Sequence, residues 1–277
     1  MTDPRLTPAR DDVAAAQLEG QVEAARYVQG VAHQVRVGAT ALREAPTHSS
    51  RLETQLLRGE LFTIYDSVGG WAWGQAERDG YVGYAETGAF SAEIVPVTHR
   101  VSVLRTLVFP APDIKSSPPY FLSLNAKVAV ESVDGRFAKL AGGGFAIAAH
   151  LTPAAAITSD WATAAELFLH TPYLWGGKDS FGLDCSGLVQ TALETGGIPA
   201  PRDSDLQEAA LGRALSPDSQ LQRGDLVFWN GHVGIMRNET ELLHASGFHM
   251  MVEIEPLADA IARITPTDGP VTSMRRL

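Results

Sequence analysis

Short apolar runs punctuated by glycine, aspartate and proline fill the chain from about Val31 to Thr152, and they limit the fold of this stretch. Residues 61–65, 71–73 and 80–84 carry the β-branched and aromatic residues typical of strands, with turn residues between them. Strands this short and this closely spaced are typical of a small barrel. The first half of the chain is therefore predicted to be β-structure.

The pattern of these strands occurs twice. Residues 45–85 and 111–149 each contain apolar-alternating strand pairs and a glycine-rich turn before the last strand, about 65 residues apart. We interpret them as two copies of one small β-barrel, over residues 31–96 and 97–153, although chance similarity between β segments is the alternative. Residues 1–30 form a separate segment, in which Thr7-Pro8 predicts a short helix toward Leu18.

The character of the chain changes near Pro153. Residues 154–169 have a helical pattern that places Ala155, Trp161, Ala165 and Leu169 roughly on one face. We expect this helix to open a third, α+β domain over residues 154–277.

Composition excludes several classes of protein. The net charge of −10 argues against a nucleic-acid or anionic-membrane partner, and no stretch reaches the roughly 18 apolar residues of a membrane span. A single cysteine permits no internal disulfide and no cysteine cluster for zinc. The first residues lack a basic region followed by an apolar one, so we expect no signal peptide and a cytoplasmic location.

That single cysteine, Cys185, lies where a glycine-rich loop turns into a helix that ends at Gly196-Gly197. A thiol in the first helical turn faces unpaired N–H groups and the positive end of the helix dipole, both of which favour the thiolate. The flanking Asp184 and Ser186 are polar, which argues against an inert apolar slot. We therefore predict a nucleophile, the alternative being a buried cysteine that only packs.

Two of the eight histidines lie in a β-context that supports this prediction. Residues 226–229 form an apolar strand, Asn230-Gly231 is a strong hairpin turn, and His232 opens the next strand. His244 lies on a third strand. If Met236 pairs with Thr240, the two histidines lie directly opposite on one face, whereas a one-residue slip would separate them.

Such a set suits a Cys–His–His relay. His232 would take the thiol proton and return it to the leaving amine, and His244 would orient His232. His249 is a second candidate for the third position. The alternatives are half-buried structural histidines, or a zinc site of Cys185, His232 and His244, which would lack a fourth ligand. We expect no metal and no organic cofactor.

The residues in this order resemble a known family. L-W-G-G, D-C-S-G-L-V-Q, R-G-D-L-V-F-W, G-H-V-G-I-M and L-L-H-A look like the NlpC-type papain-like cysteine peptidases of bacterial cell-wall metabolism, over roughly residues 156–260. Upstream, L-E-T-Q-L-L-R-G-E-L and D-G-Y-V-G-Y resemble the SH3-like domains of γ-D-glutamyl-L-diamino acid endopeptidases. The resemblance implies a papain-like catalytic domain preceded by two small SH3-like β-barrels.

The same resemblance implies a pocket for the free amine of a substrate. In that subgroup an Asp-Ser pair acts with a tyrosine and an acid from the SH3-like domain. Asp203 and Ser204 match the pair here, although Asp203 can also cap the following helix. The other residues that the resemblance assigns to substrate binding are Tyr81 (or Tyr84), Glu53 (or Glu60), Trp175 and Ser186.

The implied reaction is cleavage between γ-D-glutamate and the diamino acid of peptidoglycan stem peptides. Released peptides with a free L-alanine amine are the expected substrate, which implies a role in cell-wall recycling. Two rivals remain: an endopeptidase that acts on intact wall, and a non-hydrolytic protein that binds wall fragments. The oligomeric state is left open.

Overall fold

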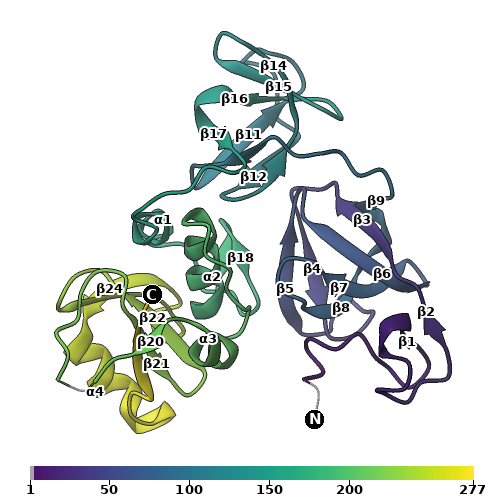
Figure 1. Ribbon diagram of the computed structural model, residues 1–277. Coiled ribbons are helices and arrows are strands. Elements are labelled where there is room, and N and C mark those ends of the chain that lie inside the picture. Colours follow the sequence, from purple (N-terminus) through teal and green to yellow (C-terminus); the bar gives the residue numbers. More distant parts are fainter. Residues whose placement is uncertain (1–2, 217) are drawn as a thin grey trace. The chain divides into compact units, whose positions relative to one another are not determined.

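The computed structural model describes residues 3–216 and 218–277 (Figure 1). The chain divides into two compact units, with the boundary between Ala154 and Ala155. The first unit is built of strands and short 3-10 turns, whereas the second contains the α-helices. The mixed architecture agrees with the predicted α+β class.

A seven-stranded antiparallel sheet forms the first half of the first unit. In spatial order its strands are β5 (Leu52–Leu57), β4 (Ala39–Arg43), β8 (Val82–Glu86), β7 (Trp71–Ala76), β6 (Leu61–Val68), β3 (Val31–Val35) and β9 (Phe90–Ser91). It encloses a core in which the rings of Phe62 and Phe90 stack with centroids 5.0 Å apart. The 3-10 helix η2 (Thr87–Ala89) precedes β9.

Two smaller sheets form the second half of this unit. The five-stranded sheet comprises β12 (Tyr120–Ser123), β11 (Arg105–Phe109), β16 (Phe145–Ile147), β15 (Phe137–Leu140) and β14 (Val130–Asp134). The three-stranded sheet comprises β13 (Lys127–Val128), β10 (His99–Val101) and β17 (Leu151–Pro153), with η3 (Ala148–His150) before β17. These strands enclose a second core, so the two predicted barrel segments have largely separate interiors, although Leu57 and the half-buried Ala39 of the first segment pack into the second core.

The predicted helix from Thr7 to Leu18 is wrong. The segment forms a tight turn closed by backbone hydrogen bonds between Arg10 and Val13, then β1 (Ala14–Ala15), which pairs with β2 (Tyr27–Val28), and the 3-10 helix η1 (Ala16–Leu18). Val13, Ala14 and Ala15 are all fully buried. Three consecutive buried residues do not fit one face of a helix at a surface, whose apolar positions recur every three to four residues.

The second unit combines a six-stranded antiparallel sheet with four helices. The strands in spatial order are β20 (Arg213–Ala214), β25 (Ser273–Arg276), β21 (Leu226–Trp229), β22 (His232–Met236), β23 (Glu241–Ser246) and β24 (Met251–Pro256). The helices are α1 (Ala162–Glu166), α2 (Cys185–Thr195), α3 (Ser204–Ala210) and α4 (Leu257–Asp268), and a small hairpin joins β18 (Lys178–Asp179) to β19 (Gly182–Leu183). Helix α2 packs against β22 and β23, which brings Cys185 to the sheet.

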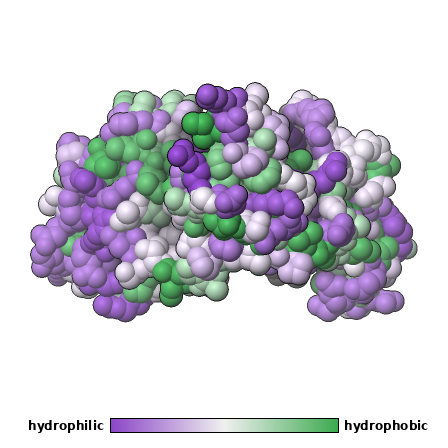
Figure 2. Space-filling view, turned by 90° about the horizontal axis from the view of Figure 1, so that it is seen from above, coloured by the Kyte–Doolittle hydropathy of each residue, from purple (hydrophilic) through white to green (hydrophobic). Residues whose placement is uncertain are grey.

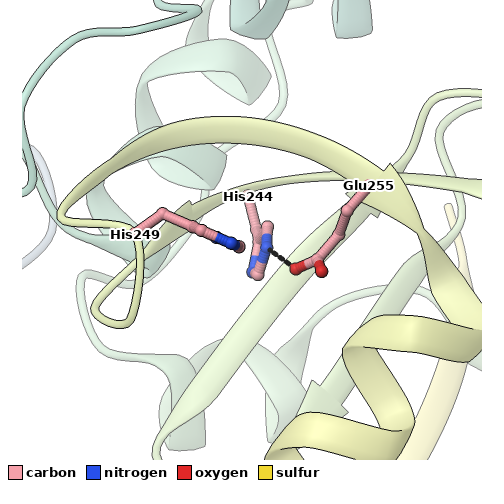
Figure 3. A group of neighbouring side chains, drawn as sticks. All are labelled: His244, His249 and Glu255. Carbon is pink, nitrogen blue, oxygen red and sulfur yellow. Dashed lines mark hydrogen bonds and ion pairs between the residues drawn. The ribbon is translucent and has the colours of Figure 1, made fainter.

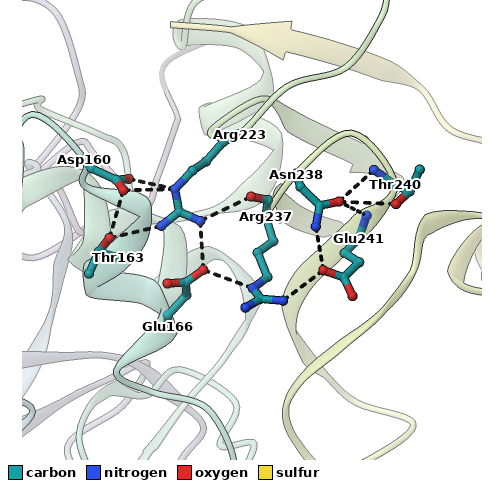
Figure 4. A network of polar contacts seen from close by, with 8 residues as sticks. All are labelled: Asp160, Thr163, Glu166, Arg223, Arg237, Asn238, Thr240 and Glu241. Atoms are coloured by element: carbon teal, nitrogen blue, oxygen red, sulfur yellow. Dashed lines mark hydrogen bonds and ion pairs between the residues drawn. The ribbon is translucent and has the colours of Figure 1, made fainter.

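The helix predicted over residues 154–169 is shorter in the structure. Its α-helical part is α1, which begins after Asp160, whose carboxylate accepts a hydrogen bond from Thr163 Oγ1 at 2.9 Å. Arg223 connects this helix to the strand turns through Asp160 at 3.0 Å and Glu166 at 2.8 Å, and Arg237 extends the network (Figure 4). The polar network therefore fixes α1 against the hairpins that carry the histidines.

Hydrophilic and hydrophobic residues are interspersed on the face shown in Figure 2. Among the residues that the structure describes, no helix has the length and apolar character needed to cross a membrane.

Candidate functional site

Asp184 ends the glycine-rich loop and caps helix α2, so that Cys185 is its first residue, as predicted. The Asp184 carboxylate accepts hydrogen bonds from the backbone N–H groups of Gly187 and Gly176, both at 2.7 Å. One oxygen thus satisfies a helix N–H group that would otherwise lack a partner, and the other holds the loop. The position of the thiol is therefore determined by its own neighbour in sequence.

Arg202 holds this cap in place, and the sequence analysis missed it. Its side chain is 1% exposed and donates to both carboxylate oxygens of Asp184, at 2.9 and 2.8 Å. It also donates to the Gly177 carbonyl at 3.1 Å and to Ser186 Oγ at 2.9 Å. A bidentate pair of this kind fixes two planar groups in one geometry. The Ser186 side chain, predicted to bind substrate, thus lies in the scaffold beneath the helix start.

The two candidate histidines share one face of the sheet and contact each other. β21 and β22 form the predicted hairpin, in which Trp229 pairs with His232. Met236 pairs with Leu242 rather than with Thr240, a displacement of two residues that preserves the face. Nε2 of His232 lies 2.8 Å from Nδ1 of His244.

The hydrogen-bond chain continues to Glu255 on β24, which sequence analysis missed. Nε2 of His244 lies 2.7 Å from Glu255 Oε1, and Arg263 on α4 forms an ion pair with the same carboxylate. The alternating pattern of residues 251–256 predicts a strand with Glu255 on one face. Placing Glu255 beside His244 also requires the pairing register of that strand, which sequence alone does not supply.

Among the described residues, the group that could hold a cation is His244, His249 and Glu255, whose ligand atoms lie within 4.8 Å of one another (Figure 3). Both ring nitrogens of His244 already have hydrogen-bond partners, and the Arg263 guanidinium pairs with Glu255. Zinc would have to displace a proton from His244 and compete with a fixed positive charge. The group is better suited to relaying and orienting protons.

Cys185 is 6% exposed, and the backbone N–H of Val233, next to His232, hydrogen-bonds its sulfur. Burial, followed by the charge of Asp184, raises the pKa of Cys185 from 9.0 to about 12. The sequence-based expectation of a lowered pKa is therefore wrong, because burial outweighs the helix start. These pKa directions favour a neutral thiol and a neutral imidazole in the resting site.

A cavity of about 410 Å³ opens over the histidines and is lined by both of them, Tyr173, Asn230, Phe248 and Arg263, among others. Burial and the nearby negative charge of Asp184 raise the pKa of Tyr173. Its hydroxyl therefore stays a hydrogen-bond donor close to the thiol. Trp175, which was predicted to line the pocket, lies two residues after Tyr173 and is 59% exposed.

The lowered pKa of the half-buried His232 predicts an acid-dependent loss of stability. Burial, then the proximity of His244 and Arg263, lowers the pKa of His232 from 6.5 to about 3. Below pH 6.5 the unfolded chain binds a proton that the folded protein excludes, so the free energy of unfolding should fall by up to about 1.4 kcal/mol per pH unit toward pH 3. His232→Gln removes this titration and should flatten the dependence. Urea unfolding at several pH values measures the pH dependence of stability for the wild type and for His232→Gln. If the two proteins lose stability equally with falling pH, the dependence does not come from His232.

Asp203 and Ser204 lie at the start of α3. Asp203 is the N-cap residue by position, but its carboxylate makes no capping hydrogen bond, so the capping alternative is not what the structure shows. Ser204 is 9% exposed. Gln207 of the same helix donates to the Ser186 carbonyl at 2.9 Å, which connects α3 to the first turn of α2.

In the first unit, Tyr81 and Glu53 form a pair. The Tyr81 hydroxyl donates to Glu53 Oε2 at 3.4 Å, and both residues line a cavity of about 360 Å³ that also includes Tyr84. The alternative acid, Glu60, is 4% exposed and accepts from the Leu57 N–H at 3.0 Å, which is a structural role within a turn. Their part in substrate binding stays a prediction.

Comparison with known proteins gives two family matches. Residues 170–264 match the NlpC/P60 family, and residues 42–90 match the bacterial dipeptidyl-peptidase SH3 domain. The resemblance inferred from the sequence motifs is thereby confirmed for both parts of the chain.

Individual relatives agree with these matches. A γ-D-glutamyl-L-lysine dipeptidyl-peptidase of Bacillus cereus is 29% identical over 246 residues, which cover 76% of this chain and 72% of the relative. Dipeptidyl-peptidase 6 of Lysinibacillus sphaericus is 36% identical over 100 residues, 36% of each chain. The crystal structure of an NlpC/P60 family protein from Bacillus cereus has the same fold, with a TM-score of 0.74 at 23% identity over 88% of this chain and 99% of that one.

Proposed function

We propose that this chain, whose residues 170–264 are an NlpC/P60 domain and whose residues 42–90 are a bacterial dipeptidyl-peptidase SH3 domain, cleaves between γ-D-glutamate and the diamino acid of peptidoglycan stem peptides. Its family and its peptidase-named relatives make it a hydrolase of peptidoglycan peptides. The observation that carries the proposal is the hydrogen bond between His232 and His244 on the strands against which the Cys185 helix packs.

In the proposed reaction, Cys185 Sγ attacks the carbonyl of the γ-D-glutamyl amide while His232 takes the thiol proton. His232 then protonates the leaving amine of the diamino acid, which leaves a thioester on Cys185. Water attacks the thioester, again with His232 as base, and restores the thiol. The helix-start N–H groups and the Tyr173 hydroxyl are candidate donors to the oxyanion.

Released peptides with a free N-terminal L-alanine are the proposed substrates, and the cytoplasm is the proposed place of cleavage. The Bacillus cereus relative aligns over 76% of this chain, beyond the NlpC/P60 segment alone, and its name describes a dipeptidyl-peptidase. An enzyme of that class releases a dipeptide and needs to recognise a free amine. Asp203 is the proposed carboxylate for this amine.

A pair of peptides tests the amine pocket. L-Ala-γ-D-Glu-diaminopimelate should be cleaved about 100-fold more efficiently than its N-acetylated form, because a charge-assisted hydrogen bond contributes roughly 1.5–3 kcal/mol. Asp203→Asn should narrow this difference, whereas Asp205→Asn, at an exposed position two residues further on, should not. The ratio of kcat/KM for the free peptide to kcat/KM for the acetylated peptide, measured for each variant, gives this difference.

Equal rates for the two peptides would remove the argument for an amine pocket. Efficient solubilisation of intact cell wall would instead support the rival endopeptidase. Binding of the free peptide without any cleavage would support the rival binding protein. Fractionation of the source cells tests the proposed location.

A further inference from the structure

The hydrogen-bond chain behind Cys185 extends beyond the Cys–His–His set and ends at a carboxylate. We propose that Glu255 is a positioning residue that sets the tautomers of His244 and His232, leaving Nδ1 of His232 bare to receive the Cys185 proton. The proposal rests on the proposed peptidase function and adds to it a fourth residue that does not touch the substrate.

The β23–β24 register places Glu255 beside His244. His244 pairs with Glu253, and Leu242 pairs with Glu255. Because side chains alternate along a strand, Glu253 and Glu255 both lie on the face of His244, but only Glu255 reaches its ring in the described structure, at 2.7 Å. Figure 3 shows the Glu255 carboxylate pointing at the His244 ring.

The surroundings of Glu255 favour its ionised form. The side chains of Glu255 and His244 are 12% and 1% exposed. Burial opposes ionisation, but the hydrogen bond with His244 and the positive charge of Arg263 outweigh it, so the pKa of Glu255 lies below its usual value. An ionised carboxylate can only accept hydrogen bonds.

The direction of every proton in the chain follows. Nε2 of His244 must carry a hydrogen, because its partner, Glu255 Oε1, only accepts. When His244 is neutral, its other nitrogen is an acceptor, so Nδ1 of His244 accepts from Nε2–H of His232. His232 itself is neutral, since burial lowers its pKa to about 3. Its Nδ1 is therefore unprotonated and able to act as a base.

The test compares Glu255→Gln with Glu253→Gln in the full-length protein. The glutamine amide at residue 255 can donate as well as accept, so it no longer enforces either tautomer. Glu253 lies on the same strand and face, and its carboxylate accepts from the Ile254 N–H at 3.2 Å, which makes it a matched control. Glu255→Asp keeps the charge on a shorter side chain and serves as a second variant if Glu255→Gln is unstable.

Two measurements read the outcome without any peptide substrate. ¹⁵N NMR of the imidazoles should show unprotonated Nδ1 on His232 and His244 in the wild type and in Glu253→Gln, and partial protonation of both in Glu255→Gln. Alkylation by iodoacetamide reports on one thiol, since the chain contains one cysteine. Its rate at pH 7 should fall at least about tenfold in Glu255→Gln, stay within twofold in Glu253→Gln and recover in part in Glu255→Asp.

Unchanged tautomers and an unchanged alkylation rate in Glu255→Gln would overturn the proposal, as would an equal loss in Glu253→Gln or protonated Nδ1 atoms in Glu255→Asp. A wild-type protein that shows these tautomers but cleaves no muropeptide would instead remove only the proposed substrate. The two proposals therefore fail in distinguishable ways.

Discussion

Cys185→Ala is expected to lower the rate of L-Ala-γ-D-Glu-diaminopimelate cleavage by at least about 10⁴-fold, because no other side chain of the set can form the thioester. The chain contains one cysteine, so the variant should also lose all labelling by iodoacetamide. The assay measures the release of free diaminopimelate. The substrate concentration is kept well above KM, so that a lower rate reports a lower kcat.

The control for this variant is its structure. Cys185 is 6% exposed, and its replacement by alanine removes one buried sulfur, so the far-ultraviolet circular dichroism should not change. Cys185→Ser replaces the thiol by a hydroxyl, whose pKa is much higher, and we expect this variant to be nearly as inactive as Cys185→Ala. Undiminished turnover by Cys185→Ala would exclude the mechanism.

The parts of the site that sequence predicted are those formed by neighbours in the chain. The first turn of α2 and the Asn230-Gly231 hairpin each depend on a few consecutive residues, and both are present. The shared face of His232 and His244 was predicted from the even spacing between them. The observed register differs by two residues from the predicted one, and a shift of two residues leaves both side chains on the same face.

The residues that sequence analysis missed depend on contacts between distant elements. Arg202 reaches Asp184 from 18 positions along the chain, and Glu255 reaches His244 only through the β23–β24 register. The pKa of Cys185 was predicted in the wrong direction because the local helix start was visible in the sequence, whereas the burial of the thiol was not.

Removal of Arg202 is expected to have the largest effect on stability. Arg202→Met would leave the Asp184 carboxylate, in a residue that is 7% exposed, without its guanidinium partner, and a broken buried ion pair costs roughly 3–5 kcal/mol. The cap would also lose its support, so activity should fall with stability. Urea unfolding followed by circular dichroism measures the change in the free energy of unfolding of the second unit.

Two further variants separate the buried pair from arginine loss in general. Arg223→Met removes an arginine that bonds the carboxylates of Asp160 and Glu166, but its side chain is 33% exposed, so we expect a cost of about 1 kcal/mol or less (Figure 4). Adding Asp184→Asn to Arg202→Met removes the unpaired charge and should recover part of the loss, because an amide is cheaper to bury than a carboxylate. If Arg202→Met costs no more than Arg223→Met, the helix start is held by the glycine-rich loop itself, and the guanidinium of Arg202 is not what positions Cys185.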